Sequence, residues 1–485
     1  MTNSRVIFLL MLCLFFQDLK GKTKRTNFIQ ILTDDQGWGD LKSYGHIFLK
    51  TPHIDNLAEE GIKLTNCYSA HSVCSPSRAA ILTGRTPYRN GVFTWIPPKH
   101  YCFLPKEEVT LPQLLRKNGY QTAHFGKWHL SYYSEAKTKV KGHYKDFKLG
   151  TTNQPTMKEY GYDYWFATGN VARPNHKDPE NFFLNGKKMG KMKGYSAQIV
   201  ANEFIKWMDN NLDMDTPFFV TIWFHEPHGP INSDPQYIKR YSQIKDKSYQ
   251  QYLANITQID EAVGKIVNTL KKHKAFDNTF IWYTSDNGPE GKDGYGTFNN
   301  SDNIYGKERY RGSTGGLRGR KRHTHEGGIR VPGIISWPEG IRNHKITAGT
   351  LSAEPVIGSD IFPTFLDIAG ISLPKHRVID GASIMPIFNG KDIHRKETIY
   401  WRNNNYEYRI AIRIDNWKLL SNSQRTKFQL YNLDLDPRET TDLSMKYPKK
   451  FTKMKKILIK KDIEVLNEGP TWWNRNNQVK EVMPK

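Results

Sequence analysis

The chain contains four short apolar runs, rich in β-branched and aromatic residues, and polar side chains follow each run directly. The runs are 28–33, 121–126, 218–224 and 279–284, and helical patterns lie between them at 111–118, 197–210 and 249–273. Strands that alternate with helices predict an α/β fold, with a mostly parallel sheet covered by helices on both faces. Because such sheets bind ligands at the carboxyl ends of their strands, we expect the polar residues to meet at one edge.

The polar residues after the first and fourth runs include a set of oxygen ligands. Asp34 and Asp35 follow the first run, and Asp286 and Asn287 follow the fourth. Three carboxylates and one amide oxygen suit a hard cation such as Ca²⁺ or Mg²⁺ better than Zn²⁺. Either pair alone is more typical of a turn with Asx hydrogen bonds. The prediction of a metal site therefore depends on the two pairs lying together.

A segment at 71–85 predicts a loop that runs into a helix, with the sequence His-Ser-Val-Cys-Ser-Pro-Ser-Arg-Ala-Ala-Ile-Leu-Thr-Gly-Arg. Pro76 fits the first turn, and Gly84 can end the helix. Cys74 would lie at the helix N-terminus, where free N–H groups favour an anion. Arg78, one turn further on, can bind two oxygens of an oxyanion. A lone cysteine is more often a small buried hydrophobe, so the whole segment carries the argument.

This segment resembles the type I sulfatase family, whose members oxidise the cysteine of Cys-X-Pro-Ser-Arg to formylglycine, the catalytic aldehyde. The resemblance extends to Gly126-Lys127-Trp128-His129 and to His228, which stands before X-Pro. The Glu-Gly-Gly-X-Arg-X-Pro pattern at 326–332 then places the family's catalytic lysine at Lys321. The pattern looks most like the arylsulfatase A and N-acetylgalactosamine-6-sulfatase types.

The resemblance implies hydrolysis of sulfate monoesters on an alkaline-phosphatase-like fold. It implies one Ca²⁺ held by Asp34, Asp35, Asp286, Asn287 and the modified Cys74. It also implies catalytic roles for Cys74, Arg78, Lys127, His129, His228 and Lys321. Arg78 and Lys127 would bind sulfate oxygens, and His129 would act as a base on the formylglycine. His228 and Lys321 would contact the departing oxygen, and all of this requires a formylglycine-generating enzyme in the host.

The N-terminus predicts export. Arg5 precedes eleven apolar residues at 6–16, a run that is too short to span a bilayer but typical of a signal peptide at 1–21. Extracellular, lysosomal and periplasmic destinations all fit this prediction, and no later run predicts a membrane span. Asn255 and Asn299 are glycosylation sequons in a eukaryotic host. Cys67 and Cys102 could form a disulfide or could both be free.

The remaining chain divides into a catalytic domain at 22–375 and a C-terminal subdomain at 376–485. The subdomain should contain a hairpin that turns at 415–416, a strand at 428–434 and a closing helix at 447–466. Together with the resemblance, this pattern predicts a small antiparallel sheet with one helix. The oligomeric state is not predicted.

A net charge of +23 indicates a surface that attracts polyanions. Nucleic acid is not indicated, because no nucleic-acid-binding motif is present. The lysine runs at 137–148, 187–193 and 449–461 each resemble a solvated surface, yet their sum fits a sulfated polysaccharide or glycosaminoglycan substrate. Two alternatives stay open: a phosphate or phosphonate ester hydrolase, and a non-catalytic protein that binds sulfated glycans.

Overall fold

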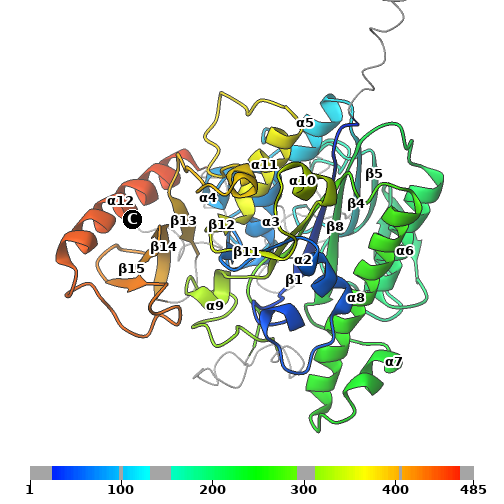
Figure 1. Cartoon of the computed structure of the whole chain (residues 1–485), viewed down its shortest axis with the longest axis horizontal. Coiled ribbons are helices and arrows are strands. Elements are labelled where there is room, and N and C mark those ends of the chain that lie inside the picture. Colours follow the sequence, from blue (N-terminus) through cyan, green and yellow to red (C-terminus); the bar gives the residue numbers. More distant parts are fainter. Residues whose placement is uncertain (1–23, 98–101, 132–153, 292–311, 404–406, 470–485) are drawn as a thin grey trace, which may run out of the picture.

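The computed structural model describes residues 24–97, 102–131, 154–291, 312–403 and 407–469. A ten-stranded mixed sheet forms its centre, in the order β11-β2-β10-β9-β1-β8-β4-β5-β6-β7 (Figure 1). Its strands are β1 (Asn27–Asp34), β2 (Ile62–Leu64), β4 (Gln121–Lys127), β5 (Tyr164–Thr168), β6 (Phe182–Leu184), β7 (Lys187–Gly190), β8 (Phe218–Pro227), β9 (Thr279–Ser285), β10 (Gly333–Ser336) and β11 (Thr350–Ser352). The four predicted strands are the adjacent strands β9, β1, β8 and β4, and they are mutually parallel. The predicted fold class is confirmed.

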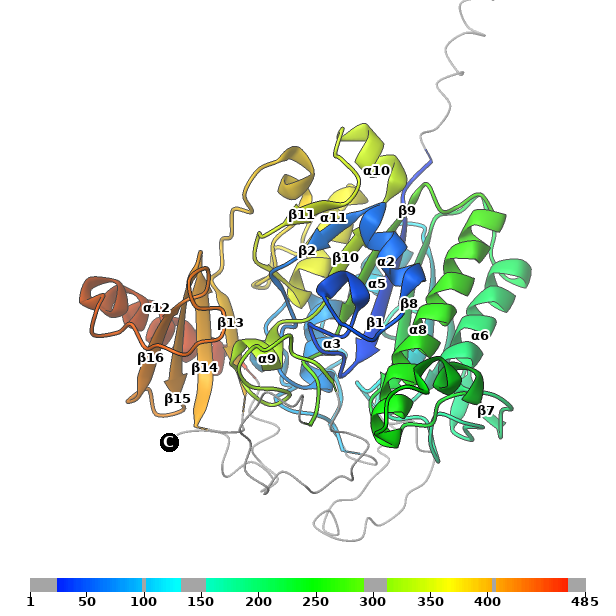
Figure 2. The ribbon, with the colours of Figure 1, turned by 60° about the horizontal axis from the view of Figure 1, so that its bottom comes forward.

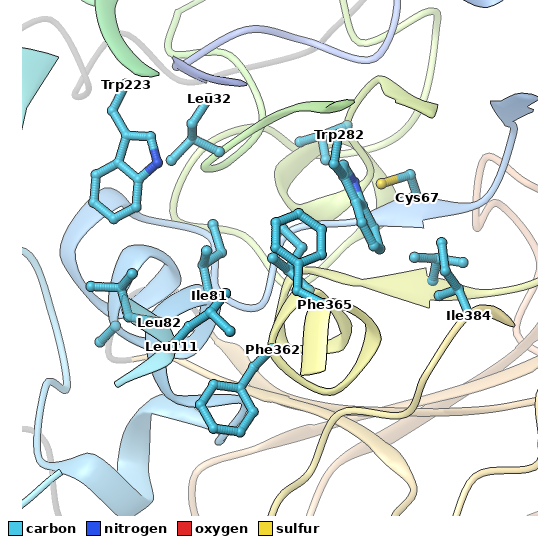
Figure 3. Close-up of a cluster of buried hydrophobic side chains, with 14 of the residues drawn as sticks. Leu32, Cys67, Ile81, Leu82, Leu111, Trp223, Trp282, Phe362, Phe365 and Ile384 are labelled. Carbon is cyan, nitrogen blue, oxygen red and sulfur yellow. The ribbon is translucent and has the colours of Figure 1, made fainter. Parts of the chain in front are cut away.

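Helices cover both faces of the sheet, as the period-two pattern of the strands requires. In β1, Ile29 and Ile31 pack with helices on one face, and Phe28 and Leu32 pack with helices on the other. The first face carries α2 (Pro52–Glu59), α6 (Ser196–Asn210), α7 (Pro235–Ile238) and α8 (Lys247–Lys272). The second carries α3 (Cys74–Thr83), α4 (Pro87–Asn90), α5 (Leu111–Lys117), α10 (Pro338–Asn343) and α11 (Ile361–Ile368). Figure 3 shows this second core, where Phe362 and Phe365 of α11 lie beside Ile81 and Leu82 of α3.

Helix α3 is buried along its whole length, which is why it carries no polar stripe for solvent. It begins at Cys74 and ends before Gly84, whose φ of 68° is left-handed and easy only for glycine. A Cβ on Gly84 would also lie 2.8 Å from the Phe362 ring. The predicted loop-to-helix segment is therefore present, and its C-terminal end is fixed at Gly84.

A four-stranded antiparallel sheet forms the C-terminal part, and α12 packs on it (Figures 1 and 2). Its elements are β13 (Ile399–Arg402), β14 (Tyr408–Ile414), β15 (Trp417–Asn422), β16 (Phe428–Asn432) and α12 (Pro448–Glu468). The hairpin turns at Asp415, whose φ is 52°. Strands β3 (Cys67–Tyr68) and β12 (Val356–Ile357) pair in a separate parallel two-stranded sheet, and α9 (Glu326–Ile329) is one short turn. The domain boundary at 375/376 stays a prediction.

The remaining predictions concern the signal segment, the glycosylation sequons, Cys67 and membrane spans. The signal segment 1–21 and Asn299 lie outside the described residues. Asn255 is fully buried in α8, and its Nδ2 lies 3.2 Å from His176 Nδ1; its glycosylation in a eukaryotic host stays a prediction. Cys67 forms no disulfide and lies 3.7 Å from Thr284 Oγ1. Among the described helices, none is both long and apolar enough to cross a bilayer.

Candidate active site

The predicted site residues meet at the carboxyl edge of the central strands. Strand β1 ends in Asp34, β4 ends in Lys127, and Asp286 directly follows β9. The end of β1 lies beside α3 (Figure 2), and one ligand atom each of Asp34, Asp35 and Cys74 lie within 4.8 Å of one another. The parallel sheet thus joins residues from distant parts of the chain, as its topology predicts.

Two buried ion pairs hold the centre of the site. Lys127 Nζ lies 2.6 Å from Asp34 Oδ2. Arg78 donates from Nε and Nη2 to Asp286 Oδ2 at 2.9 and 2.7 Å, and from Nη1 to the Lys127 carbonyl at 2.9 Å. The Arg78 guanidinium also lies 5.1 Å from the centre of the Trp223 ring. These contacts fix the Arg78 side chain in one orientation beside Cys74.

Asp35 forms a second centre, and its φ of 67° turns the chain sharply after β1. Lys321 Nζ lies 2.6 and 2.8 Å from its two carboxylate oxygens. Asn287 Nδ2 donates to Asp35 Oδ1 at 2.7 Å, and His228 Nε2 lies 3.7 Å from Asp35 Oδ2. Residues from three other segments therefore converge on this carboxylate.

The donor set fits a hard cation. Asp34 Oδ1 and Asn287 Oδ1 are buried and have no hydrogen-bond partner among the described residues. Buried polar atoms normally have partners, so two orphaned oxygens beside Asp35 indicate that a further group binds there. Carboxylate and amide oxygens suit Ca²⁺ or Mg²⁺. Asp286 is less available to bind a cation, because Arg78 donates to its Oδ2 and the Asp35 N–H donates to its Oδ1 at 3.2 Å.

The surroundings of the site keep Asp34 ionised, Lys321 protonated and the Cys74 thiol neutral. Burial would raise the pKa of Asp34, but Lys127 and Arg78 outweigh it and hold that pKa well below the usual range. Burial would lower the pKa of Lys321, but Asp35 outweighs it and raises that pKa. Burial raises the pKa of Cys74 to about 11, so the thiol is neutral at physiological pH. The thiolate is the nucleophilic form, so an unmodified Cys74 is a poor nucleophile.

The histidines differ in what they offer the site. His129 Nε2 lies 2.9 Å from the Ile96 carbonyl, which only accepts, so Nε2 carries the hydrogen and Nδ1 the lone pair. Nδ1 is buried without a partner among the described residues. By the same argument, His228 Nδ1 donates to the Gly229 carbonyl at 2.7 Å, which leaves a lone pair on Nε2. His225 Nε2 lies 2.7 Å from Thr168 Oγ1, and none of the possible metal-binding groups among the described residues includes His225.

Glu290 is a site residue that the sequence analysis did not single out. Its Oε2 lies 3.7 Å from Lys321 Nζ, and its Oε1 lies 2.7 Å from Arg322 Nη1. Its ligand atom also forms a group with those of Asp35 and His228. Its position three residues after Asn287 was the available signal, because the chain there is still at the strand edge.

A buried charge network outside the motifs supports the Lys321 segment. Lys418 Nζ of β15 lies 2.8 Å from Glu326 Oε1 and 3.0 Å from Glu439 Oε1. Glu439 also accepts a hydrogen bond from the Glu326 N–H at 2.7 Å, and Tyr68 donates to Glu326 Oε2 at 2.7 Å. The C-terminal sheet thus holds α9, which begins five residues after Lys321. The backbone beside Lys321 is also held, because the Arg322 N–H donates to the Ser72 carbonyl at 2.8 Å.

The arrangement agrees with known proteins. The Sulfatase family model matches residues 26–371, and the C-terminal model of N-sulphoglucosamine sulphohydrolase matches residues 319–467. The chain is 30% identical to dog N-acetylgalactosamine-6-sulfatase over 407 residues, which cover 79% of this chain and 69% of that protein. It is 32% identical to rat steryl-sulfatase, over 85% of this chain and 78% of that one.

Solved structures show the same fold. The crystal structure of Ps i-CgsB in complex with k-i-k-neocarrahexaose matches with a TM-score of 0.76 and 26% identity, over 94% of this chain and 98% of that one. A phosphonate monoester hydrolase of Agrobacterium radiobacter, at 19% identity and a TM-score of 0.61 over 91% of this chain and 96% of that one, shares the fold alone. The family model spans most of the chain and includes the whole cluster from Asp34 to Lys321, so the chain belongs to the sulfatase family and is a sulfuric ester hydrolase.

Proposed function

We propose that this sulfatase removes sulfate from sulfated sugars and uses the residues at this edge of the sheet in the roles below. The observation that carries the proposal is the position of Cys74. It lies at the start of α3, within 4.8 Å of Asp34 and Asp35 ligand atoms, and the cations Arg78 and Lys127 lie beside those carboxylates. A sulfate ester needs such cations, because bare carboxylates would repel it.

Two groups that the chain does not itself encode complete the site. A formylglycine made from Cys74 would supply, as its hydrate, the oxygen nucleophile that displaces the alcohol from sulfur. One Ca²⁺ held by Asp34, Asp35, Asp286 and Asn287 would neutralise charge on the sulfate oxygens. The orphaned oxygens of Asp34 and Asn287 support this metal set.

The chain's own residues bind sulfate and move protons. Arg78 and Lys127 bind non-bridging sulfate oxygens. His129 takes a proton at Nδ1, the nitrogen whose lone pair has no partner among the described residues. Lys321 gives a proton to the departing alcohol oxygen, since neutral His228 presents a lone pair at Nε2 and not a hydrogen. Overall, water and a sulfate monoester give an alcohol and sulfate.

The substrate class follows from charge and relatives. A net charge of +23 favours an anionic polymer over a small aryl sulfate. One structural neighbour is solved with a neocarrahexaose, and relatives are N-acetylgalactosamine-6-sulfatases. We therefore propose a sulfated polysaccharide or glycosaminoglycan substrate, an exported enzyme, and maturation by a formylglycine-generating enzyme.

Mass spectrometry of the Cys74 peptide, together with sulfate release, tests the proposal. We expect a mass about 18 Da below that of cysteine in active preparations, from the conversion of thiol to aldehyde. We also expect sulfate release from defined sulfated oligosaccharides and none from Cys74→Ala. An active preparation with only unmodified cysteine would refute the mechanism. Faster release of phosphate than of sulfate from one nitrophenyl scaffold would favour the phosphoesterase alternative, and full function in Cys74→Ala would favour a glycan-binding protein.

A further inference from the structure

A row of lysines lies along α12, at the end of the molecule opposite α6 and α8 (Figure 1). Between Pro448 and Lys461 the chain has seven lysines and no acidic residue. Lys449, Lys453, Lys456 and Lys460 are all exposed and are spaced four, three and four residues apart. This spacing places them on one stripe of the helix, roughly 16 Å long at 1.5 Å per residue. We name these four residues the lysine stripe.

The lysine stripe does not serve the stability of the helix. Its first member, Lys449, lies in the first turn, which contains no acidic residue. The positive end of the helix macrodipole disfavours cations there, and like charges one turn apart repel each other. The acidic residue that follows, Asp462, is buried and pairs with Arg402 and Arg425, so it does not neutralise the stripe.

Aromatic rings of β15 and β16 lie beneath a second set of lysines on α12. Lys450 Nζ lies 5.5 Å from the centre of the Trp417 ring, and Lys455 Nζ lies 4.8 Å from that of Phe428. Tyr447 packs edge-on against Trp417 at 5.0 Å and is 38% exposed. Rings with one apolar face and adjacent cations can pack against a sugar ring while the cations contact its anionic groups.

We propose that the lysine stripe binds the sulfated polysaccharide away from the active site. The choice of ligand rests on the proposed function, because a linear sulfated polymer long enough to reach both surfaces is the polyanion such an enzyme meets. Charge complementarity supports it, since a straight row of cations matches a linear polyanion. A membrane is a poorer match, because the apolar residues of α12 that a bilayer would bury, Met454, Leu458 and Val465, are already packed inside the protein.

Binding is tested with the full-length Cys74→Ala protein and polymeric carrageenan at several salt concentrations. The test variant is K449Q/K453Q/K456Q/K460Q. The control is K239Q/K245Q/K265Q/K274Q, which removes the same charge from other exposed lysines. We expect the stripe variant to lose about tenfold or more in affinity, with a slope of log affinity against log salt smaller by about 3, as for four lost contacts on a linear polyanion. The control variant, and a variant with arginine at all four stripe positions, should bind carrageenan with an affinity close to that of the parent.

Three outcomes would overturn the proposal: equal losses in test and control variants, unchanged binding in the stripe variant, or stripe-dependent binding to anionic vesicles but not to carrageenan. In the background with Cys74 intact, the stripe variant should keep the parent's turnover of nitrophenyl sulfate and of short oligosaccharides, and raise KM only for polymer. Binding and turnover are measured separately. If no glycan releases sulfate while binding remains stripe-dependent, the proposed function fails and the surface stands. If glycans release sulfate but their binding does not depend on the stripe, the proposed function stands and the proposed binding surface fails.

Discussion

Arg78 donates two hydrogen bonds to a single carboxylate oxygen, Oδ2 of Asp286, at 2.9 and 2.7 Å. The two residues are 208 positions apart and both are fully buried. This pair joins the helix that begins at Cys74 to the strand end that carries Asp286 and Asn287. The orientation of the guanidinium that we propose binds sulfate therefore depends on the loop that carries the proposed metal ligands.

Replacing Arg78 tests this dependence. Arg78→Lys keeps the charge but cannot make the forked contact, so we expect turnover to fall by about 10²-fold or more. Arg89→Lys is the matched control, because Arg89 is also buried and paired with carboxylates, at Asp380 and Glu468, away from the site. It should lower the thermal midpoint with little change in kcat. Equal effects of the two variants on kcat would contradict the role of Arg78.

Calcium should stabilise the protein through Asp34. At a calcium concentration of 100 times Kd, a single site adds about 2.7 kcal/mol to the free energy of unfolding. We expect a chelator to lower the thermal midpoint and calcium to restore it in the parent, but not in Asp34→Asn. Asp40→Asn is the control, because Asp40 is buried nearby but accepts from Gly37, Ser313 and Tyr252. A full calcium shift in Asp34→Asn would rule out the proposed ligand set.

Lys321 should matter most for substrates with poor leaving groups. If it protonates the departing oxygen, Lys321→Gln should lower kcat on a sugar sulfate by about 10²–10⁴-fold and much less on nitrophenyl sulfate, whose leaving group needs no proton. Lys127→Gln is the control, because a residue on a non-bridging oxygen should affect both substrates alike. Equal losses for Lys321→Gln on the two substrates would place Lys321 elsewhere in the mechanism.

The buried Lys418 should be essential for stability. Lys418→Met leaves Glu326 and Glu439 buried without their cation, which costs about 3–5 kcal/mol of unfolding free energy. Denaturant unfolding measures this loss. Lys427→Met removes an exposed lysine paired with Glu407 and should leave stability unchanged. If both variants unfold alike, the network does not hold α9 in place.

His124 should make the protein less stable in acid. Burial lowers the pKa of His124 to about 3, whereas in the unfolded chain it is about 6.5. Between these values the unfolded chain binds a proton that the folded chain does not, so stability is lost as pH falls below about 6.5. We expect a contribution of about 2 kcal/mol between pH 7 and pH 5. Unfolding curves of His124→Gln, which cannot titrate, should show a correspondingly shallower pH dependence; the same slope as the parent would contradict it.

Local patterns in the sequence were sufficient for much of the fold. The four apolar runs predicted β1, β4, β8 and β9, because alternation and composition are properties of neighbouring residues. The same holds for α3, whose start at Cys74 and end at Gly84 follow from proline, alanine and glycine preferences. Strand ends at one sheet edge also predicted that Asp34, Asp35, Asp286 and Asn287 would lie together.

Local patterns did not predict the environment or role of residues that are determined by burial or by contacts between distant segments. The sequon at Asn255 reads as a surface feature, yet the residue is fully buried beside His176. Glu290 and the Lys418 network carry no motif, and their roles arise only when Lys321 and α9 pack against them.

The sequence by itself determined the strands, the helix that begins at Cys74 and the family to which the chain belongs, because these depend on short-range patterns. The tertiary structure alone decided which cation pairs with which carboxylate. It paired Lys127 with Asp34, Arg78 with Asp286 and Lys321 with Asp35, which are 93, 208 and 286 residues apart in the sequence. Each pair is stable only because burial removes competing water, and burial is a property of the assembled fold.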